Sequence, residues 1–241
     1  MEAVFKRHYR AGMASVPFER DDSRWAAQEL RVPVPKNLGG TIYQLRYTEP
    51  MPPAVMGAAP SGMEWIIRGK GPAKYAFDLV EQAWFAPDQS VQPVELPSAT
   101  PRIVEEHQID DEQALLSRLR HSQVIAHATG LVVEHLQSHV RSSIPSGQVE
   151  VDDLYVGTDR AGQQYAVPVE AKGVSGNISL VQVEQGADFC LHRMSELTCV
   201  PLGAKLAADG SIYVFEFEGL PAGTPIGSGV RLANQYRFLL A

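Results

Sequence analysis

Two acidic residues and a lysine in one short part of the chain have the types and spacing that metal-dependent phosphodiester hydrolysis needs. Asp152 lies in the run VEVDDLYVG, and Glu170 and Lys172 lie two residues apart in the run YAVPVEAKG. Carboxylates can hold a divalent cation that activates water, and a nearby lysine can orient that water or offset charge on the phosphate. Because Mg²⁺ prefers oxygen ligands and keeps several waters, two carboxylates and one backbone carbonyl are sufficient protein ligands.

A β-hairpin is expected to position these side chains. Both runs are typical of strands, and the turn between them covers residues 158–162 and ends in glycine. Side chains two apart on a strand share a face, so Glu170 and Lys172 project together while Ala171 points into the core. Asp152 and Glu170 are equally far from the middle of the turn, which predicts that they are neighbours across the ladder.

The register of the acidic pair leaves an alternative. Asp153 follows Asp152 directly, and either could be the ligand. We favour Asp152 because it alternates with Glu150 on one face, whereas Asp153 shares its face with Val151 and Tyr155; Glu150 and Asp153 remain accessory candidates. A structural ion pair is the alternative interpretation, since charged residues are abundant and charge clusters are not always functional. The aliphatic context favours a site: Val149, Val151, Leu154, Val156, Val167 and Val169.

The stretch GQVEVDDLYVG…YAVPVEAKG resembles the PD-(D/E)xK nuclease superfamily, which has the restriction-endonuclease-like fold. The family pattern is an acidic residue on one strand and Glu-x-Lys on the next, with a helix before and a helix after, and this order covers about residues 111–218. The resemblance implies that Asp152 and Glu170 bind Mg²⁺, or Mn²⁺ as a substitute, with the Ala171 carbonyl as third ligand. It also implies that Lys172 positions the attacking water. The Pro-Asp dipeptide of the family name is absent, because Val151 precedes Asp152.

Two further side chains are implied by the same resemblance. Glu134, on a helix expected before the hairpin, occupies the place of an additional acidic ligand, although a surface position explains it equally well. Gln185, on the helix after Glu-x-Lys, resembles a polar residue that some members direct at the site. Gln182 and Glu184 are competing choices on that helix.

The flanking elements predict an α/β domain with a central mixed β-sheet flanked by helices. Helical spacing begins at Asp110, bends at Thr129-Gly130 and continues through LVVEHLQSHV to about Val140. After the hairpin, Ser179 and Gln182 form a capping-box pattern at the start of another helix. A second hairpin around residues 208–210 and a final strand complete the order.

The histidines and cysteines suggest no other chemistry. His135 and His139 have the helical i, i+4 spacing of a zinc pair, but no third ligand follows at a recognised spacing. We therefore expect them to be solvated or to face phosphate. Cys190 and Cys199 are too few for a disulfide framework or a four-cysteine zinc site, and Cys190 is expected to be a buried thiol.

The N-terminal part has a different pattern. A helix is expected at residues 21–31 and a helix or strand at 41–47, followed by a hairpin with Arg68, Lys70 and Lys74 near its tip. This order resembles a winged-helix DNA-binding module, in which these three cations would contact DNA; a helper subdomain with a solvated turn is the alternative. The proline-rich stretch 86–101 predicts a boundary near 100, which gives an N-terminal module 1–100 and a nuclease domain 101–241.

The composition is compatible with both parts. The 44% hydrophobic and 20% charged residues are ordinary for a soluble protein, with no bilayer-spanning apolar run and no secretory signal, so a cytoplasmic protein is expected. The net charge is −7, with 11 Lys and Arg against 7 Asp and Glu in residues 1–75, and 10 against 21 in residues 76–241. A basic front suits DNA, and an acidic back suits cation binding.

The sequence thus predicts a Mg²⁺-dependent DNA endonuclease of the restriction type, acting on double-stranded DNA. One site per chain and two strands to cut favour a two-fold homodimer. The rival hypothesis is a non-catalytic DNA-binding or assembly subunit on a nuclease-like fold, because a fold does not fix a function.

Overall fold

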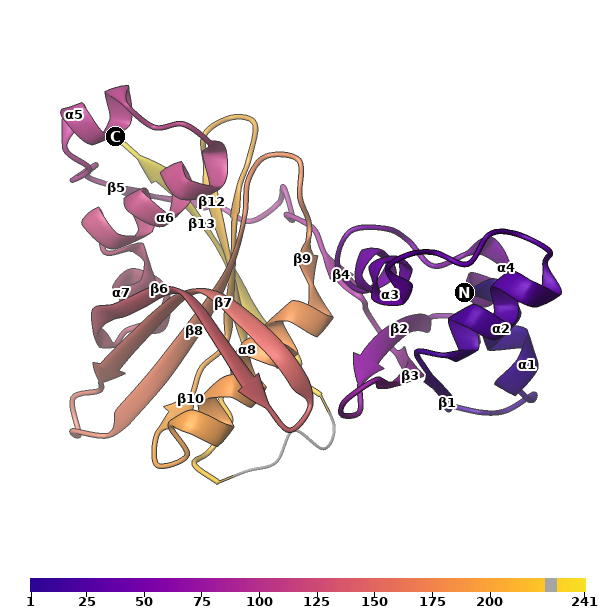
Figure 1. The fold of residues 1–241 in the computed structure, drawn as a ribbon. Coiled ribbons are helices and arrows are strands. Elements are labelled where there is room, and N and C mark those ends of the chain that lie inside the picture. The colour runs from indigo at the N-terminus through magenta and orange to yellow at the C-terminus, as the bar shows by residue number, and fades with distance from the viewer. Residues whose placement is uncertain (224–228) are drawn as a thin grey trace. The chain divides into compact units, whose positions relative to one another are not determined.

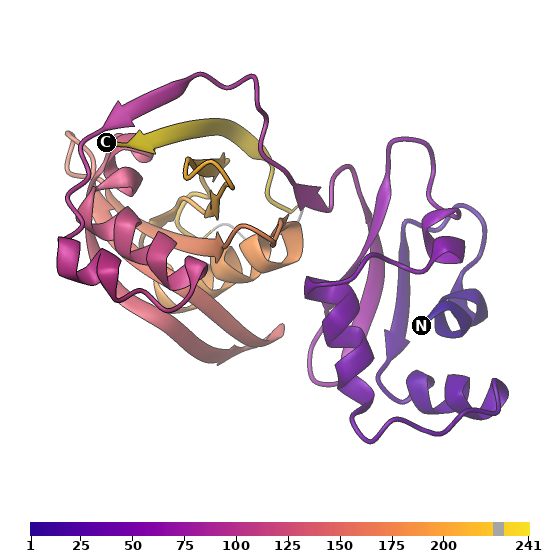
Figure 2. The same cartoon turned by 90° about the horizontal axis from the view of Figure 1, so that it is seen from above.

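The computed structural model describes residues 1–223 and 229–241 and divides into two compact units (Figure 1). The smaller unit comprises Met1–Ala83 and Pro145–Gln148, and the larger comprises Trp84–Ile144 and Val149–Ala241. The chain thus passes into the larger unit at residue 84, not near residue 100 as predicted. The proline-rich stretch is part of that unit because its strand β5 (Pro93–Leu96) pairs with the last strand, β13 (Leu232–Leu240), as Figure 2 shows.

The smaller unit is a three-stranded antiparallel sheet with four helices. Residues 38–47 form a helix, which Asn37 caps by accepting a hydrogen bond from the Gly39 N–H at 3.0 Å. The elements are α1 (Glu2–His8), β1 (Ser15–Glu19), α2 (Asp22–Glu29), α3 (Leu38–Tyr47), α4 (Pro53–Met56), β2 (Glu64–Gly69) and β3 (Lys74–Val80). The predicted hairpin is confirmed as β2 and β3, which pair antiparallel. Strand β1 pairs with β3 on its other side.

Aromatic side chains close the core of this unit. The Phe5 ring lies 5.1 Å from both the Trp65 and Phe77 rings, centroid to centroid, in edge-on geometry. Such contacts add stabilisation of about 0.5–1.5 kcal/mol to that of the buried area.

The larger unit is an α/β domain built on an eight-stranded mixed sheet, as predicted at that level. The strand order is β5-β13-β12-β11-β8-β7-β6, with β10 pairing to β8, and β8 and β11 run parallel. The strands not yet given are β4 (Trp84–Phe85), β6 (Val132–Ile144), β7 (Gly147–Thr158), β8 (Gln164–Lys172), β9 (Ile178–Ser179), β10 (Thr198–Cys199), β11 (Leu202–Leu206) and β12 (Ile212–Phe217). The helices are α5 (Arg102–Glu106), α6 (Asp111–His121), α7 (Val124–Thr129) and α8 (Leu180–Arg193).

Helices cover both faces of the β7–β8 hairpin. Leu115 and Leu119 of α6 belong to one buried cluster with Tyr155 and Val169 of the hairpin. Pro168, whose side chain points the other way, lies under α8, where a Cβ atom on Gly186 would be only 3.1 Å from it. The alternation of the strands therefore determines which hairpin side chains face α6 and which face α8.

Strand β6 corrects one sequence prediction. The run LVVEHLQSHV is not a helix but part of this strand, which forms the edge of the sheet beside β7. Helix α7 ends because Gly130 adopts a left-handed conformation (φ 68°). The β-branched Val132 and Val133 then favour an extended chain, and a tight turn at Pro145 returns it as β7.

The start of α8 corrects another. Ser179 is the N-cap residue as predicted, but its side chain makes no capping hydrogen bond. Its presumed partner Gln182 instead reaches Glu170 on β8. Of the helices that the structure describes, none has both the length and the apolarity required to cross a membrane.

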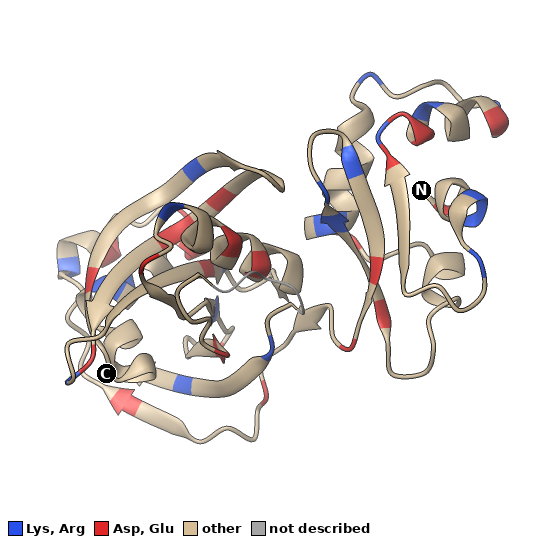
Figure 3. Cartoon of the chain, turned by 90° about the horizontal axis from the view of Figure 1, so that it is seen from below, with Lys and Arg blue, Asp and Glu red and all other residues tan. Residues whose placement is uncertain are grey.

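The charges differ between the two units, as Figure 3 shows. Residues 1–83, in the smaller unit, contain 11 Lys and Arg and 9 Asp and Glu. Residues 84–241 contain 10 Lys and Arg and 19 Asp and Glu. The acidic excess therefore belongs to the larger unit, which carries the predicted metal ligands.

Candidate active site

The structure brings Asp152, Glu170 and Lys172 together near the end of the β7–β8 ladder. The antiparallel register pairs Asp153 with Val169, which places Asp152 and Glu170 on the α8 side of the sheet. The Glu170 carboxylate is 5% exposed and accepts a hydrogen bond from the Lys172 ammonium. Asp152 Oδ2 accepts a hydrogen bond of 2.9 Å from the Ala171 N–H.

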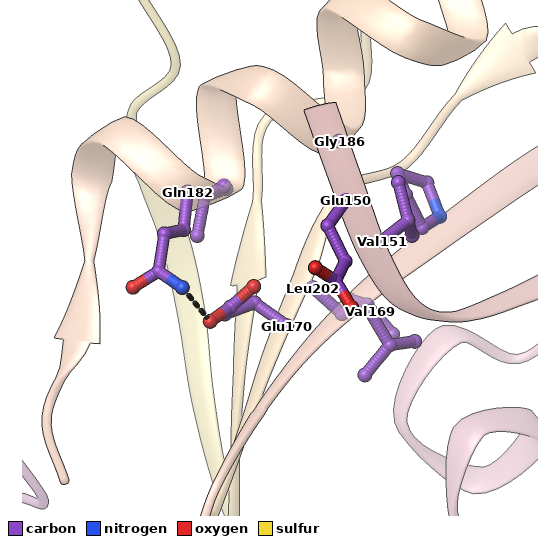
Figure 4. A pocket seen from close by; sticks show the side chains of 9 residues that line it. Glu150, Val151, Val169, Glu170, Gln182, Gly186 and Leu202 are labelled. Atoms are coloured by element: carbon purple, nitrogen blue, oxygen red, sulfur yellow. Dashed lines mark hydrogen bonds between the residues drawn. The ribbon is translucent and has the colours of Figure 1, made fainter. Parts of the chain in front are cut away.

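Helix α8 adds an amide to this cluster. Gln182 points toward Glu170, and its Nε2 donates a hydrogen bond to the carboxylate (Figure 4). Gln182 Oε1 is buried and accepts no hydrogen bond from the residues described. The two side chains line a small cavity between α8 and the sheet, together with Glu150 and Gly186. Gln185, the sequence candidate on this helix, lies almost one turn farther along.

Burial and neighbouring negative charge raise the pKa values of Asp152 and Glu170. Burial and the neighbouring Asp152 raise the pKa of Glu170 to about 8, although Lys172 opposes this. Burial also raises the pKa of Asp152 above its ordinary value, against the hydrogen bond from Ala171 and the charge of Lys172. Burial and like charge thus disfavour the ionised form of Glu170 in the metal-free protein, a penalty that a bound cation would relieve.

Glu112, on the first turn of α6, belongs to the same electrostatic environment and was not singled out in the sequence. Burial and then the charge of Asp152 raise the pKa of its carboxyl group. In the sequence it looks like an ordinary acidic residue near a helix N-terminus, where the helix dipole favours it. The informative signal was three acidic residues in succession, 110–112, at the start of the helix that precedes the hairpin.

Lys172 is the principal cation of the cluster. Burial disfavours its charge, but Glu170, Asp152 and Glu112 together raise its pKa above the ordinary value. It is therefore positive at neutral pH and offsets part of the acidic charge around it.

Hydrogen bonds from Lys205 and Asp111 fix the backbone that follows Lys172. The buried Lys205 of β11 donates from Nζ to the carbonyls of Gly173 and Val174 at 3.1 and 3.0 Å, and to a third carbonyl at Gly176. Asp111 Oδ2 accepts a hydrogen bond of 2.6 Å from the Val174 N–H. A Cβ atom on Gly173 would be only 2.2 Å from Asp111, so the first turn of α6 meets the end of β8 closely.

Asp153 lies on the opposite face and has a different environment. It is fully buried, and Arg120 donates to its two oxygens at 2.9 and 2.8 Å. Ser138 and Tyr155 donate at 2.8 and 3.0 Å, and His135 Nε2 lies 3.1 Å away. The geometry thus places Asp152, and not Asp153, on the face of Glu170.

The other two accessory carboxylates differ in position. Glu150 is on the face of Asp152 and raises its pKa, but it pairs with Arg141 at 3.0 Å. Glu134 lies exposed on the edge strand β6, because the helix on which it was placed does not form. His135 and His139 are likewise on this strand, so their zinc-like helical spacing does not apply.

The three cations predicted to contact DNA lie in the smaller unit. Arg68 and Lys70 both pair with the buried Asp78, at 3.3 and 2.9 Å. Lys74 is exposed at the first position of β3. Asp78 therefore offsets part of the positive charge at this hairpin.

Within residues 1–223 and 229–241, no three His, Cys, Asp or Glu side chains form a ready-made metal site. A cation at Asp152 and Glu170 would therefore complete its coordination with the Ala171 carbonyl and water, as Mg²⁺ commonly does. No family model, curated protein or solved structure matches this chain.

Proposed function

We propose that this protein is a Mg²⁺-dependent DNA endonuclease that hydrolyses phosphodiester bonds with Asp152, Glu170 and Lys172. One observation carries the proposal: a buried carboxylate, its like-charged neighbour and a lysine converge on one face at the end of a hairpin. Buried acids with strongly raised pKa are common at functional sites. The resemblance to PD-(D/E)xK nucleases supports the same three residues.

The donor set fits a hard cation. Asp152, Glu170 and the Ala171 carbonyl would hold Mg²⁺, or Mn²⁺ in its place, and water would complete the shell. When bound, the ion supplies the charge that activates water for attack on phosphorus. The like charges that raise the pKa of Glu170 are the ones that such an ion would relieve. The buried Gln182 Oε1, unsatisfied among the described side chains, can accept a hydrogen bond from such a water.

The chain's own groups have distinct tasks in this proposal. Lys172 orients the attacking water and offsets charge that develops on the phosphate oxygens. Gln182 fixes the orientation of the Glu170 carboxylate through its amide N–H. Lys205 and Asp111 hold the segment after Lys172, so that α6 and β8 keep Glu112 and Lys172 in place.

The smaller unit supports DNA as the substrate. Its order of helix, strand, helices and hairpin resembles a winged-helix module, and its charge is slightly basic. In this proposal, Lys74, with smaller contributions from Arg68 and Lys70, contacts the backbone of double-stranded DNA. A homodimer would cut both strands, and the cytoplasm remains the expected compartment.

A second function has its own supporting observation. The Glu170–Lys172 ion pair joins a buried carboxylate to a partly buried lysine and could serve stability alone, which favours a non-catalytic DNA-binding or assembly subunit. In that case removing one partner should cost about 3–5 kcal/mol, because a buried charge is left unpaired.

Glu170→Gln separates the two functions. Cleavage of a mixture of plasmid and linear duplex DNA would be measured with Mg²⁺ or Mn²⁺, and stability by urea denaturation in EDTA. If the protein is an enzyme, the variant loses at least about 100-fold in cleavage rate, while the free energy of unfolding is unchanged or higher. Glu134→Gln, the same chemical change on the exposed edge strand, serves as the control and should behave as wild type.

The opposite pattern would favour the subunit. There the wild type cuts no DNA with either ion, and Glu170→Gln unfolds at much lower urea. Cleavage retained in full by Glu170→Gln would end the metal-ligand proposal.

A further inference from the structure

One histidine on the edge strand has an unusual backbone conformation beside the site. His139 adopts φ 48°, in the left-handed region that residues other than glycine rarely occupy. Irregularities of this kind in edge strands redirect a side chain, and they are frequent next to active sites. The fold therefore holds His139 in a conformation that local preference disfavours.

The imidazole of His139 bridges two elements of the candidate site. Its Nε2 lies 3.0 Å from Gln113 Nε2 on α6, and its Nδ1 lies 3.9 Å from Glu150 Oε1 on β7. The side chain is 43% exposed, so a ligand can reach it. The imidazole lies within electrostatic reach of the carboxyl groups of Glu112 and Asp152.

The charges of the site explain what such a residue could bind. A nucleic acid phosphate would approach Glu112, Glu150, Asp152 and Glu170 and be repelled by them. Lys172, which the proposed function assigns to the reacting phosphate, also pairs with Glu170, while Arg141 pairs with Glu150 and Lys205 donates to three backbone carbonyls. Among the described residues, His139 contacts the Gln113 amide, whose Nε2 can only donate, so the proton of the neutral ring lies on Nδ1. Nδ1 is 3.9 Å from Glu150 Oε1, beyond hydrogen-bond distance, and is the donor that a phosphate could accept from.

His135, four residues earlier, provides a contrast on the same strand. Its Nε2 lies 3.1 Å from both Ser138 Oγ and Asp153 Oδ1 on the far face of β7. That histidine belongs to the buried network around Asp153. The two histidines that were alike in the sequence therefore have different environments.

We propose that His139 binds a backbone phosphate of the nucleic acid strand in the active site, as a hydrogen-bond donor from its imidazole ring. This inference rests on the proposed function, because it names the phosphodiester as the ligand. The site would then hold the strand from two sides, with Lys172 at the reacting phosphate and His139 at β6.

The experiment compares two substitutions that suit the backbone at residue 139. His139→Gly removes the ring without strain, and His139→Asn keeps a hydrogen-bond donor in a residue that tolerates positive φ. His192→Ala is the matched control, since that side chain is 42% exposed at the far end of α8. Binding to a fluorescent DNA duplex would be measured across salt concentrations with Ca²⁺ in place of Mg²⁺, and Mn²⁺ affinity by electron paramagnetic resonance.

We expect His139→Gly to weaken duplex binding about 10-fold, the effect of losing one hydrogen bond to a charged group. His139→Asn should retain most of the affinity, and His192→Ala and the Mn²⁺ affinity of all variants should match wild type. Binding of His139→Gly at wild-type strength would overturn the inference, as would a parallel loss of Mn²⁺, which would make His139 a metal ligand.

These outcomes remain separable from the proposed function. A wild type that binds duplex through His139 but cuts no DNA with Mg²⁺ or Mn²⁺ supports the phosphate contact and rejects the nuclease. A wild type that cuts DNA while His139→Gly binds and cuts equally well rejects only the phosphate contact.

Discussion

Two adjacent aspartates on β7 have opposite environments. Asp153 is fully buried and is surrounded by donors from Arg120, Ser138, Tyr155 and His135. Asp152 accepts one backbone hydrogen bond, and burial and then the charge of Glu150 raise its pKa. A single residue step along the strand separates a carboxylate neutralised within the fold from one held against like charge.

The difference distinguishes structural from functional charge. A buried carboxylate whose partners are all supplied by the protein has no capacity left for a ligand, and its removal harms the fold. A carboxylate held beside like charge costs stability in the free protein, and a cation relieves that cost on binding. The comparison therefore predicts that substitutions on the two faces of β7 have opposite effects on stability and on cation binding.

The largest expected effect comes from removing the guanidinium that serves Asp153. Arg120→Met leaves a fully buried carboxylate without its charge partner and should lower the free energy of unfolding by about 3–5 kcal/mol. Asp152→Asn should leave stability in EDTA unchanged or raise it, because it removes repulsion with Glu170 and Glu112. Both values come from urea denaturation at pH 7.

The same two variants should differ in metal response. Addition of Mg²⁺ should raise the melting temperature of wild type but not that of Asp152→Asn, and folded Arg120→Met should still respond. Equal destabilisation by the two substitutions would break the comparison, since both aspartates would then be structural.

A smaller effect is expected from the pH dependence of the metal-free protein. The folded-state pKa of Glu170 is raised from 4.5 to about 8, so its contribution to stability is complete below pH 4.5 and is lost as pH rises toward 8. Since one pKa unit corresponds to about 1.4 kcal/mol, Glu170→Gln should gain about 2–4 kcal/mol relative to wild type over this interval. Urea denaturation in EDTA at several pH values measures the difference.

Mg²⁺ provides the control for this measurement. A cation competes with the proton on Glu170, so saturating Mg²⁺ should reduce the pH dependence in wild type and have no such effect in the variant. Parallel pH profiles of wild type and Glu170→Gln in EDTA would show that Glu170 keeps its ordinary pKa in the fold.

The central hairpin could be predicted from the sequence because local rules determine it. The turn at 158–162 and the alternation of apolar residues indicated both strands, and the alternation also separated Asp152 from Asp153. The second hairpin and the last strand followed from the same kind of evidence and are confirmed.

Long-range pairing explains the failures. Val132, Leu136 and Val140 have helical spacing, yet they form an edge strand because β7 offers a pairing partner, and Val132 and Leu136 remain 73% and 53% exposed. The position of Glu112 depends on how α6 meets the end of β8, which no local pattern encodes. The hydrogen-bond partners of Asp153 come from four separate positions in the chain, so its full set of partners could not be predicted either.

The smallest effect is expected from removing one hydrogen-bond donor of Asp153, the Tyr155 hydroxyl. Tyr155 is buried, its hydroxyl donates to Asp153 Oδ2 at 3.0 Å, and burial together with that carboxylate raises the pKa of the phenol well above its ordinary value. Tyr155→Phe removes this one donor and keeps the ring, so it should cost about 1–2 kcal/mol while Arg120 still holds Asp153. In a double-mutant cycle with Asp153→Asn, the coupling energy should be at least about 0.5 kcal/mol, because the two groups share a hydrogen bond. The Mg²⁺-induced rise in melting temperature should equal that of wild type, since the lost donor lies on the face away from Glu170. A coupling energy near zero would mean that the hydroxyl does not serve Asp153, and an altered Mg²⁺ response would mean that the two faces of β7 are not independent.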